Sequence, residues 1–69
     1  MKKIEINLHE ETTQIIYAKF KGITRQAVKN KINRNQIKYR YIKELNIYLV
    51  EIPENEKNLF IQFLKTNYL

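Results

Sequence analysis

The chain contains one glycine, Gly22, and one proline, Pro53, and each lies where the spacing of the apolar residues changes. Glycine adopts the positive φ angles that end a helix in a short turn. Proline has no backbone N–H to donate and therefore ends a strand. Since no linker or low-complexity stretch separates the segments around these residues, we expect a short series of closely connected elements.

The apolar pattern around these two positions predicts the order β-α-α-β-β-α, and hence an α+β fold. Alternation of Ile4, Ile6 and Leu8 with polar residues is typical of a strand. Helical spacing follows twice, and two adjacent runs of β-branched and aromatic residues then predict a β-hairpin. The predicted elements are a strand at 4–8, two helices within 10–33, a hairpin at 37–52 and a last helix at 54–68.

The length of 69 residues predicts one domain, 1–69, with a small core. Domains of this size commonly depend on a disulfide, a metal or a partner subunit. The sequence has no cysteine and one histidine, His9, so we expect neither a disulfide nor an ordinary metal site. By elimination, we expect no cofactor, and self-association as the added source of stability.

The charge balance predicts a polyanionic partner. The 13 Lys and Arg residues outnumber 7 Glu residues, for a net charge of +6, and the isoelectric point is near 9.7. Such an excess favours nucleic acid or an anionic membrane as the partner, although a solvated basic surface gives the same composition. Because no apolar run approaches the length of a membrane span and the first residues do not resemble a signal peptide, we expect a cytoplasmic protein.

The most informative stretch predicts a helix-turn-helix. Two helices that meet at a steep angle need a small residue at their closest approach, and Ala18 supplies it. Gly22 follows four positions later and suits the turn. Ile23 would fill the turn, while Val28 and Ile32 would hold the second helix, which starts at about Thr24, against the first. An ordinary helical hairpin with a glycine turn is the alternative.

The same residues resemble known DNA-binding families. The segment 18–28 is similar to the helix-turn-helix of excisionase-type and MerR-like proteins, which follow it with a β-hairpin wing. The segment 14–32 also resembles lambda Cro-type repressors, whose trailing hairpin forms a dimer. The chain departs from these families at Lys21 and Lys31, where an apolar residue is common, and only one helix precedes Gly22. The resemblance implies a small winged helix-turn-helix fold, with the excisionase-like layout favoured.

The outward face of the second helix carries the side chains that read base edges. Arginine binds guanine O6 and N7 with two hydrogen bonds, and glutamine or asparagine binds adenine N6 and N7 in the same way. Helix-turn-helix proteins contact bases from the N-terminal part of this helix. The predicted base-reading residues are Arg25, Gln26, Lys29, Asn30 and Asn33.

Basic residues continue beyond this face, and no acidic residue occurs from Gly22 to Tyr41. This segregation favours phosphate contacts over a uniformly solvated surface. In the hairpin, Glu44 would weaken attraction to DNA at the tip. The predicted phosphate or wing contacts are Thr24, Lys21, Lys31, Arg34, Lys38, Arg40 and Lys43.

Two further sets of residues have alternative interpretations. Tyrosines beside basic residues can stack on the bases of a single strand, but tyrosines in strands are more often half-buried strand formers. The last helix is more apolar than a helix covering one edge requires, so its residues are either core or a dimer interface. The tyrosines are Tyr39, Tyr41 and Tyr48, and the dimerisation candidates are Phe60, Phe63, Leu64 and Tyr68.

These observations predict a non-enzymatic protein, because the sequence lacks a histidine–carboxylate–nucleophile set and a glycine-rich phosphate loop. We expect sequence-specific binding to double-stranded DNA by a small phage- or plasmid-type regulator. An excisionase-like factor that bends DNA is an alternative, and either would act as a homodimer or as a cooperative array. A single-strand binder or a protein-interaction module are the alternatives from other classes. We do not expect membrane binding.

Overall fold

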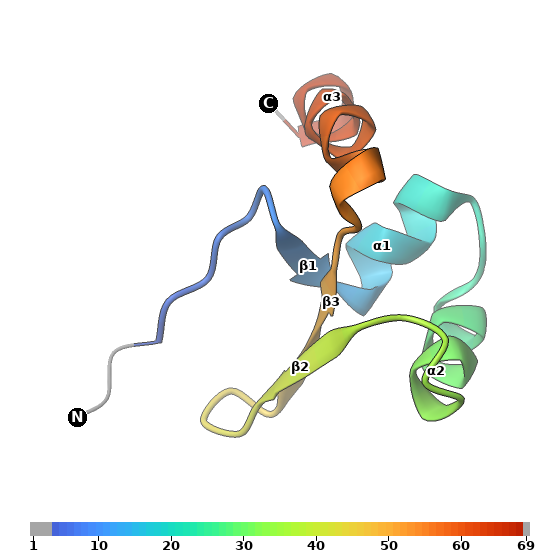
Figure 1. The fold of residues 1–69 in the computed structure, drawn as a ribbon, viewed down its shortest axis with the longest axis vertical. Coiled ribbons are helices and arrows are strands. Elements are labelled where there is room, and N and C mark those ends of the chain that lie inside the picture. The colour runs from blue at the N-terminus through green and yellow to red at the C-terminus, as the bar shows by residue number, and fades with distance from the viewer. Residues whose placement is uncertain (1–3, 69) are drawn as a thin grey trace.

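The computed structural model describes residues 4–68, which form a small α+β fold of the winged-helix-like kind (Figure 1). The predicted fold class and element order are confirmed, apart from a short 3-10 helix, η1, before the last helix. The elements are β1 (Glu11–Thr13), α1 (Gln14–Lys21), α2 (Arg25–Asn33), β2 (Tyr39–Ile42), β3 (Ile47–Glu51), η1 (Glu54–Glu56) and α3 (Lys57–Tyr68).

The sheet is antiparallel with the order β1-β3-β2, so that β3 is the central strand. Alternate residues of a strand point to opposite faces. Val50 and Ile52, at 0% and 1% exposure, point toward the helices and belong to the main core. Leu49 lies on the other face together with its register partner Arg40. The core also includes Tyr17, Ala18, Val28, Ile32 and Phe60.

The first strand lies later in the chain than the apolar alternation predicts. Ile4–Asn7 has no regular structure, and a turn follows in which the Glu10 backbone N–H donates to the Asn7 carbonyl at 2.9 Å. The paired strand is β1, where Thr12 lies opposite Val50 and is buried. Alternation of apolar and polar residues shows that a segment can form a strand. The strand forms, however, only where the backbone lies beside β3 and can pair with it. The prediction of a strand at 4–8 is therefore wrong.

Both helices of the helix-turn-helix begin at a threonine cap. The Thr13 Oγ1 accepts the Ile16 N–H at 3.3 Å, and the Thr24 Oγ1 accepts the Ala27 N–H at 3.1 Å. These bonds satisfy donors that have no partner inside the helix. The helix predicted to start at about residue 10 starts at Gln14: Glu10 belongs to a turn, Glu11–Thr13 form β1, and Thr13 caps the helix.

Both helices also end in the same way. Gly22 has a φ of 68°, the Gly22 N–H donates to Lys19, and the Ile23 N–H donates to the Ala18 carbonyl at 3.0 Å. This pair of bonds is a Schellman motif, which requires a left-handed residue. After α2 the left-handed residue is Asn35, with a φ of 56°. The predicted glycine turn is therefore present, and it fixes the direction in which α2 leaves α1.

The hairpin and the last helix occur where predicted, with shorter strands. Residues 43–46 form the turn of the hairpin, in which Asn46 has a φ of 53°. Strand β3 ends at Glu51, before Pro53, and α3 packs Phe60 against Phe20 with ring centroids 5.1 Å apart. Within residues 4–68, no helix combines the length and the apolar character needed to cross a membrane.

Candidate nucleic-acid interface

Helix α2 presents one buried face and one polar, exposed face. Val28 and Ile32 are 0% and 4% exposed and pack into the core. The exposed face bears amides and cations, and the Gln26 side-chain amide donates to the Asn30 Oδ1 at 3.2 Å. All five residues predicted to read bases lie on it: Arg25, Gln26, Lys29, Asn30 and Asn33.

The core and the turn hold this helix at the surface. Ala18 is 5% exposed on α1, and α1 and α2 pack together with Ile23 against the same cluster. Because the Gly22 turn ends α1 in a defined geometry, the second helix projects from the body of the fold (Figure 1). The packing of α2 on α1 around the buried Ala18, directed by the Gly22 turn, leaves the polar face of α2 exposed.

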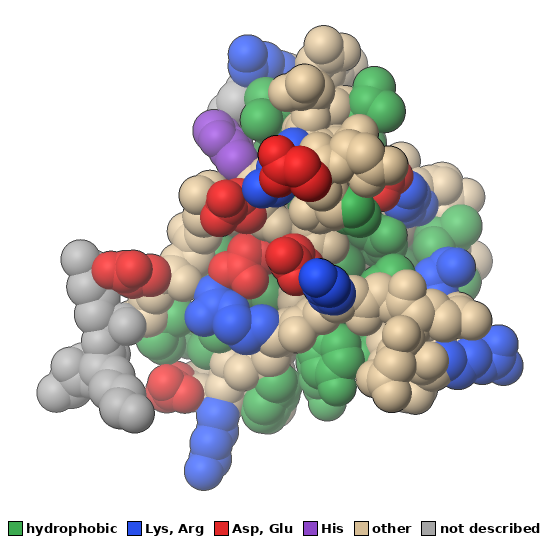
Figure 2. Space-filling model, in the orientation of Figure 1, with side chains coloured by type: hydrophobic (Ala, Val, Ile, Leu, Met, Phe, Trp, Pro, Cys, Tyr) green, Lys and Arg blue, Asp and Glu red, His purple; other side chains and the backbone are tan. Residues whose placement is uncertain are grey.

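Three basic side chains have carboxylate partners, and they lie away from the exposed face of α2. Lys21 pairs with Glu56, and Arg40 pairs with Glu11 at 2.5 Å. Lys57 pairs with Glu54 at 2.8 Å and with Glu10 at 3.5 Å. On the face shown in Figure 2, acidic side chains gather over its centre, whereas the end formed by α2 shows basic and uncharged polar groups.

Within residues 4–68, six other basic residues from α2 to the hairpin make no ion pair. Five of their side chains are exposed and that of Lys31 is partly buried, and no acidic residue lies among them in the sequence before Glu44. The segregation of acids and unpaired bases makes one end of the molecule electropositive. These six residues are Arg25, Lys29, Lys31, Arg34, Lys38 and Lys43.

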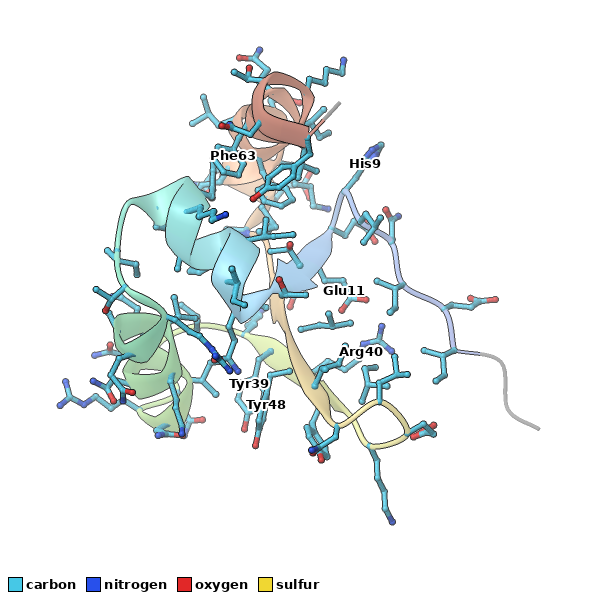
Figure 3. The ribbon with its side chains drawn as sticks, turned by 180° about the vertical axis from the view of Figure 1, so that it is seen from behind. His9, Glu11, Tyr39, Arg40, Tyr48 and Phe63 are labelled. Carbon is cyan, nitrogen blue, oxygen red and sulfur yellow. The ribbon has the colours of Figure 1, made fainter. Side chains whose placement is uncertain are left out.

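Arg40 is placed differently from the other predicted phosphate contacts. Its guanidinium donates to both Glu11 oxygens and to the Glu5 carbonyl at 2.8 Å. The hydrogen bond to Glu11 raises the pKa of Arg40 above its ordinary value. In Figure 3, Arg40 and Glu11 lie on the side of the N-terminal segment, away from α2. Arg40 therefore lies beside β1 on the sheet face opposite the helices, with its guanidinium held by Glu11, and is not part of the candidate interface.

Lys21 and Thr24 also have structural partners. Lys21 is at the end of α1, next to Glu56, with its ammonium 5.6 Å from the centre of the Phe20 ring. The Thr24 hydroxyl oxygen caps α2 by accepting the Ala27 N–H. Thr24 remains exposed at the start of the candidate interface, while Lys21 contributes to the attachment of η1.

A groove separates α2 from the hairpin, and the sequence interpretation did not identify it. It has a volume of about 450 Å³ and an open mouth. One wall carries cations from α2, and the other carries aromatic and apolar residues of β3 together with the start of α1. The lining residues are Thr13, Gln14, Ile15, Arg25, Lys29, Asn46, Ile47 and Tyr48.

The tyrosines of the hairpin form a continuous row on the side of the sheet that faces the helices. The Tyr48 ring is 4.9 Å from Tyr41 and 5.6 Å from Tyr39, measured between centroids. Each of the three side chains is 41–44% exposed, and Figure 3 shows Tyr39 and Tyr48 side by side. The period of two that places Tyr48 on the same face as Val50 could have revealed this row from the sequence.

The last helix contributes to the core more than to an exposed surface. Phe60 is 0% exposed, so its proposed role in dimerisation is wrong. Phe63 and Leu64 are partly buried against the same core. Of the four dimerisation candidates, only Tyr68, 46% exposed, is a largely exposed side chain. The apolar character of α3 is thus mainly explained by its packing on α1.

Comparison with known proteins adds no family to this picture. No protein-family model, no curated protein and no solved structure matches the chain. Within residues 4–68, no three His or acidic side chains are grouped so as to hold a metal ion. The functional assignment therefore depends on the fold, the exposed face of α2 and the distribution of charge.

Proposed function

We propose that this protein binds double-stranded DNA in a sequence-specific manner, with α2 in the major groove. The observation that carries the proposal is the exposed face of α2, which combines amide and cationic side chains and has no acidic neighbour. These are the side-chain types that recognise base edges and phosphates. A helix-turn-helix scaffold presents such a helix to DNA.

The charge distribution supports the proposed orientation. The six unpaired basic residues lie on α2 and along the way to the hairpin tip, while Glu10, Glu11, Glu51, Glu54 and Glu56 lie on β1, β3 and η1 or next to them. DNA that approaches α2 would therefore contact cations first, while the acidic residues on or next to β1, β3 and η1 lie away from it. Neutralised phosphates release counterions, so the affinity is expected to fall steeply with added salt.

As a small regulator of phage or plasmid type, the protein would repress or activate by occupying its site. The alternative, an excisionase-like factor that bends DNA, fits one observation: Phe60, one of the four dimerisation candidates, is buried in the core and is not available to a partner subunit. A factor that binds direct repeats side by side does not need such a dimer. The symmetry of the selected sites separates the two: inverted repeats indicate a dimeric regulator, and direct repeats indicate an array.

The test begins with selection of bound duplexes from a random pool, followed by affinity measurements at about 50 and 200 mM salt. We expect enrichment of a defined sequence and a strong loss of affinity at the higher salt. Asn30→Ala should reduce binding to the selected duplex, whereas the matched control Asn58→Ala, at an exposed position of α3, should not. No enrichment, or tighter binding to a single strand of the same sequence, would contradict the proposal.

A further inference from the structure

We propose that the groove between α2 and the hairpin holds the sugar–phosphate backbone of one DNA strand. In this arrangement Arg25 and Lys29 bind phosphates, and Tyr48 packs against deoxyribose. Base reading is left to the outermost residues of α2: Gln26, Asn30 and Asn33. This inference rests on the proposed function and divides the five residues of the exposed face of α2 into two groups.

The helical positions support the division. Residues of an α-helix follow one another at about 100° around its axis. Asn30 lies directly opposite the buried side defined by Val28 and Ile32, and Gln26 and Asn33 lie beside Asn30. Arg25 and Lys29 lie on the flank, closer to the buried side, and both line the groove together with Tyr48. Their side chains thus face the hairpin and not the outermost surface of the helix.

The chemistry of the groove fits a nucleic-acid backbone. Its α2 wall supplies Arg25 and Lys29, which belong to the unpaired cations of the described chain. Its other wall supplies apolar and aromatic surface: Ile15 is 51% exposed and Tyr48 is 41% exposed. A backbone presents an anion and an apolar sugar face at every nucleotide, so one strand can satisfy both walls along its length.

The first helix also has a place in this arrangement. In helix-turn-helix complexes the helix before the recognition helix crosses the backbone. The start of α1, at Gln14 and Ile15, lines the groove and therefore lies where the strand would pass. The hairpin then contacts DNA through its tyrosine face, while Arg40 remains on the opposite face with Glu11.

The amide pair on the outermost surface predicts the bases that are read. The Gln26 Nε2 donates to the Asn30 Oδ1 at 3.2 Å. This bond leaves the Gln26 Oε1 as an acceptor and the Asn30 Nδ2 as a donor. Adenine presents the complementary N6 donor and N7 acceptor in the major groove. We therefore expect A·T pairs at the positions contacted by these amides.

The decisive experiment replaces single phosphates of the selected duplex with neutral methylphosphonates and measures the affinities of four variants. Arg25→Ala and Lys29→Ala should weaken binding by the same factor on the selected and on an unrelated duplex. Each should lower the slope of log K against log salt by about 0.9. At least one methylphosphonate that weakens binding of the original protein should have no further effect on Arg25→Ala, and at least one should have none on Lys29→Ala.

Two variants serve as comparisons. Arg34→Ala removes an unpaired cation outside the groove lining, and it should remain fully sensitive to the same methylphosphonates. Asn30→Ala should lose roughly 5- to 150-fold on the selected duplex, as expected for one base contact, and little on the unrelated one. Circular dichroism of each variant establishes that it is folded.

The outcomes separate this inference from the proposed function. If Arg25→Ala loses affinity only on the selected duplex, Arg25 reads a base and the groove inference is overturned. The same holds if no methylphosphonate loses its effect in Arg25→Ala or Lys29→Ala. If the original protein fails to prefer a duplex sequence at all, the proposed function itself fails before any variant is compared.

Discussion

At the end of the molecule built from β1, the last residues of β3 and η1, basic side chains meet carboxylates. Lys57 lies between Glu10 and Glu54, and Lys21 reaches Glu56. On α2, by contrast, the cations Arg25, Lys29 and Lys31 form no ion pair within the described residues. Lysine and arginine side chains thus form internal ion pairs at the end built from β1 and η1, whereas those on α2 are available to a partner.

This comparison is more informative than net charge. A charge of +6 predicts attraction to polyanions but does not indicate where they bind. Exposed ion pairs add little to stability, yet they neutralise the cations that they hold. Only the unpaired cations are expected to contribute counterion release, which makes the comparison testable through DNA affinity and its dependence on salt.

The largest effect is expected from charge reversal on α2. Lys29→Glu would place a carboxylate where we expect a DNA phosphate, and apposed like charges cost several kcal/mol. We therefore expect the affinity for the selected duplex to fall about 100-fold or more, measured by fluorescence anisotropy. Lys65→Glu makes the same charge change at an exposed position of α3 and should alter the affinity little. Equal losses in the two variants would mean that binding responds only to net charge.

The second effect concerns the stability of the turn between α1 and α2, which directs α2 away from the ion-paired end of the molecule. Gly22 has a φ of 68°, and no atom lies within 4 Å of the position of an added Cβ. Gly22→Ala should therefore lower the free energy of unfolding by about 1 kcal/mol through backbone strain alone. Urea unfolding measures the change. Asn35→Gly, at the equivalent position after α2, should stabilise slightly, and a stabilising Gly22→Ala would contradict this account.

The sequence was sufficient for the helix-turn-helix and the hairpin because their signals are local. Ala18, Gly22 and the threonine cap act within a few residues of themselves. Phe60 shows the limit of this approach: its helical spacing fits both a core position and an interface. Only the packing against Phe20 decides between them.

Contacts between distant segments could not be predicted in the same way. Arg40 was predicted to be a wing cation because Lys38 and Lys43 flank its strand, but Glu11, 29 residues earlier in the chain, binds it across the sheet. The first strand was predicted at the wrong place for a related reason. The segment that pairs with β3 contains Thr12, and the alternating segment 4–8 before it does not pair. The groove was missed because Arg25 and Tyr48 come together only in the folded chain.

A third effect should appear at alkaline pH, at the ion-paired end. Burial raises the pKa of Tyr17 above 10.0, with the carboxylate of Glu56 adding to the shift and Lys21 opposing it. A raised folded-state pKa gives stability that is present below the unfolded value of about 10 and is lost as pH rises through the folded value. We therefore expect the melting temperature to fall as the pH rises above about 10, and to fall less in Tyr17→Phe.

Tyr68→Phe controls for the loss of a hydroxyl at a position where the ring is 46% exposed. If Tyr17→Phe and Tyr68→Phe change the alkaline melting profile equally, burial of Tyr17 is not the cause. A smaller alkaline loss in Tyr17→Phe alone would indicate that the buried tyrosine limits stability at this end of the molecule.

The smallest effect separates two neighbouring cations that the sequence does not distinguish. Lys38 is exposed and makes no ion pair within the described residues, whereas Arg40 is held by Glu11. Lys38→Ala should therefore lower the salt slope of DNA binding by up to about 0.9, the contribution of one phosphate contact. Arg40→Ala should leave the slope unchanged and slightly lower the melting temperature, because Glu11 and the Glu5 carbonyl lose their donor. If Arg40→Ala reduces the slope as much as Lys38→Ala, the ion pair opens on DNA, and the paired cations also take part in binding.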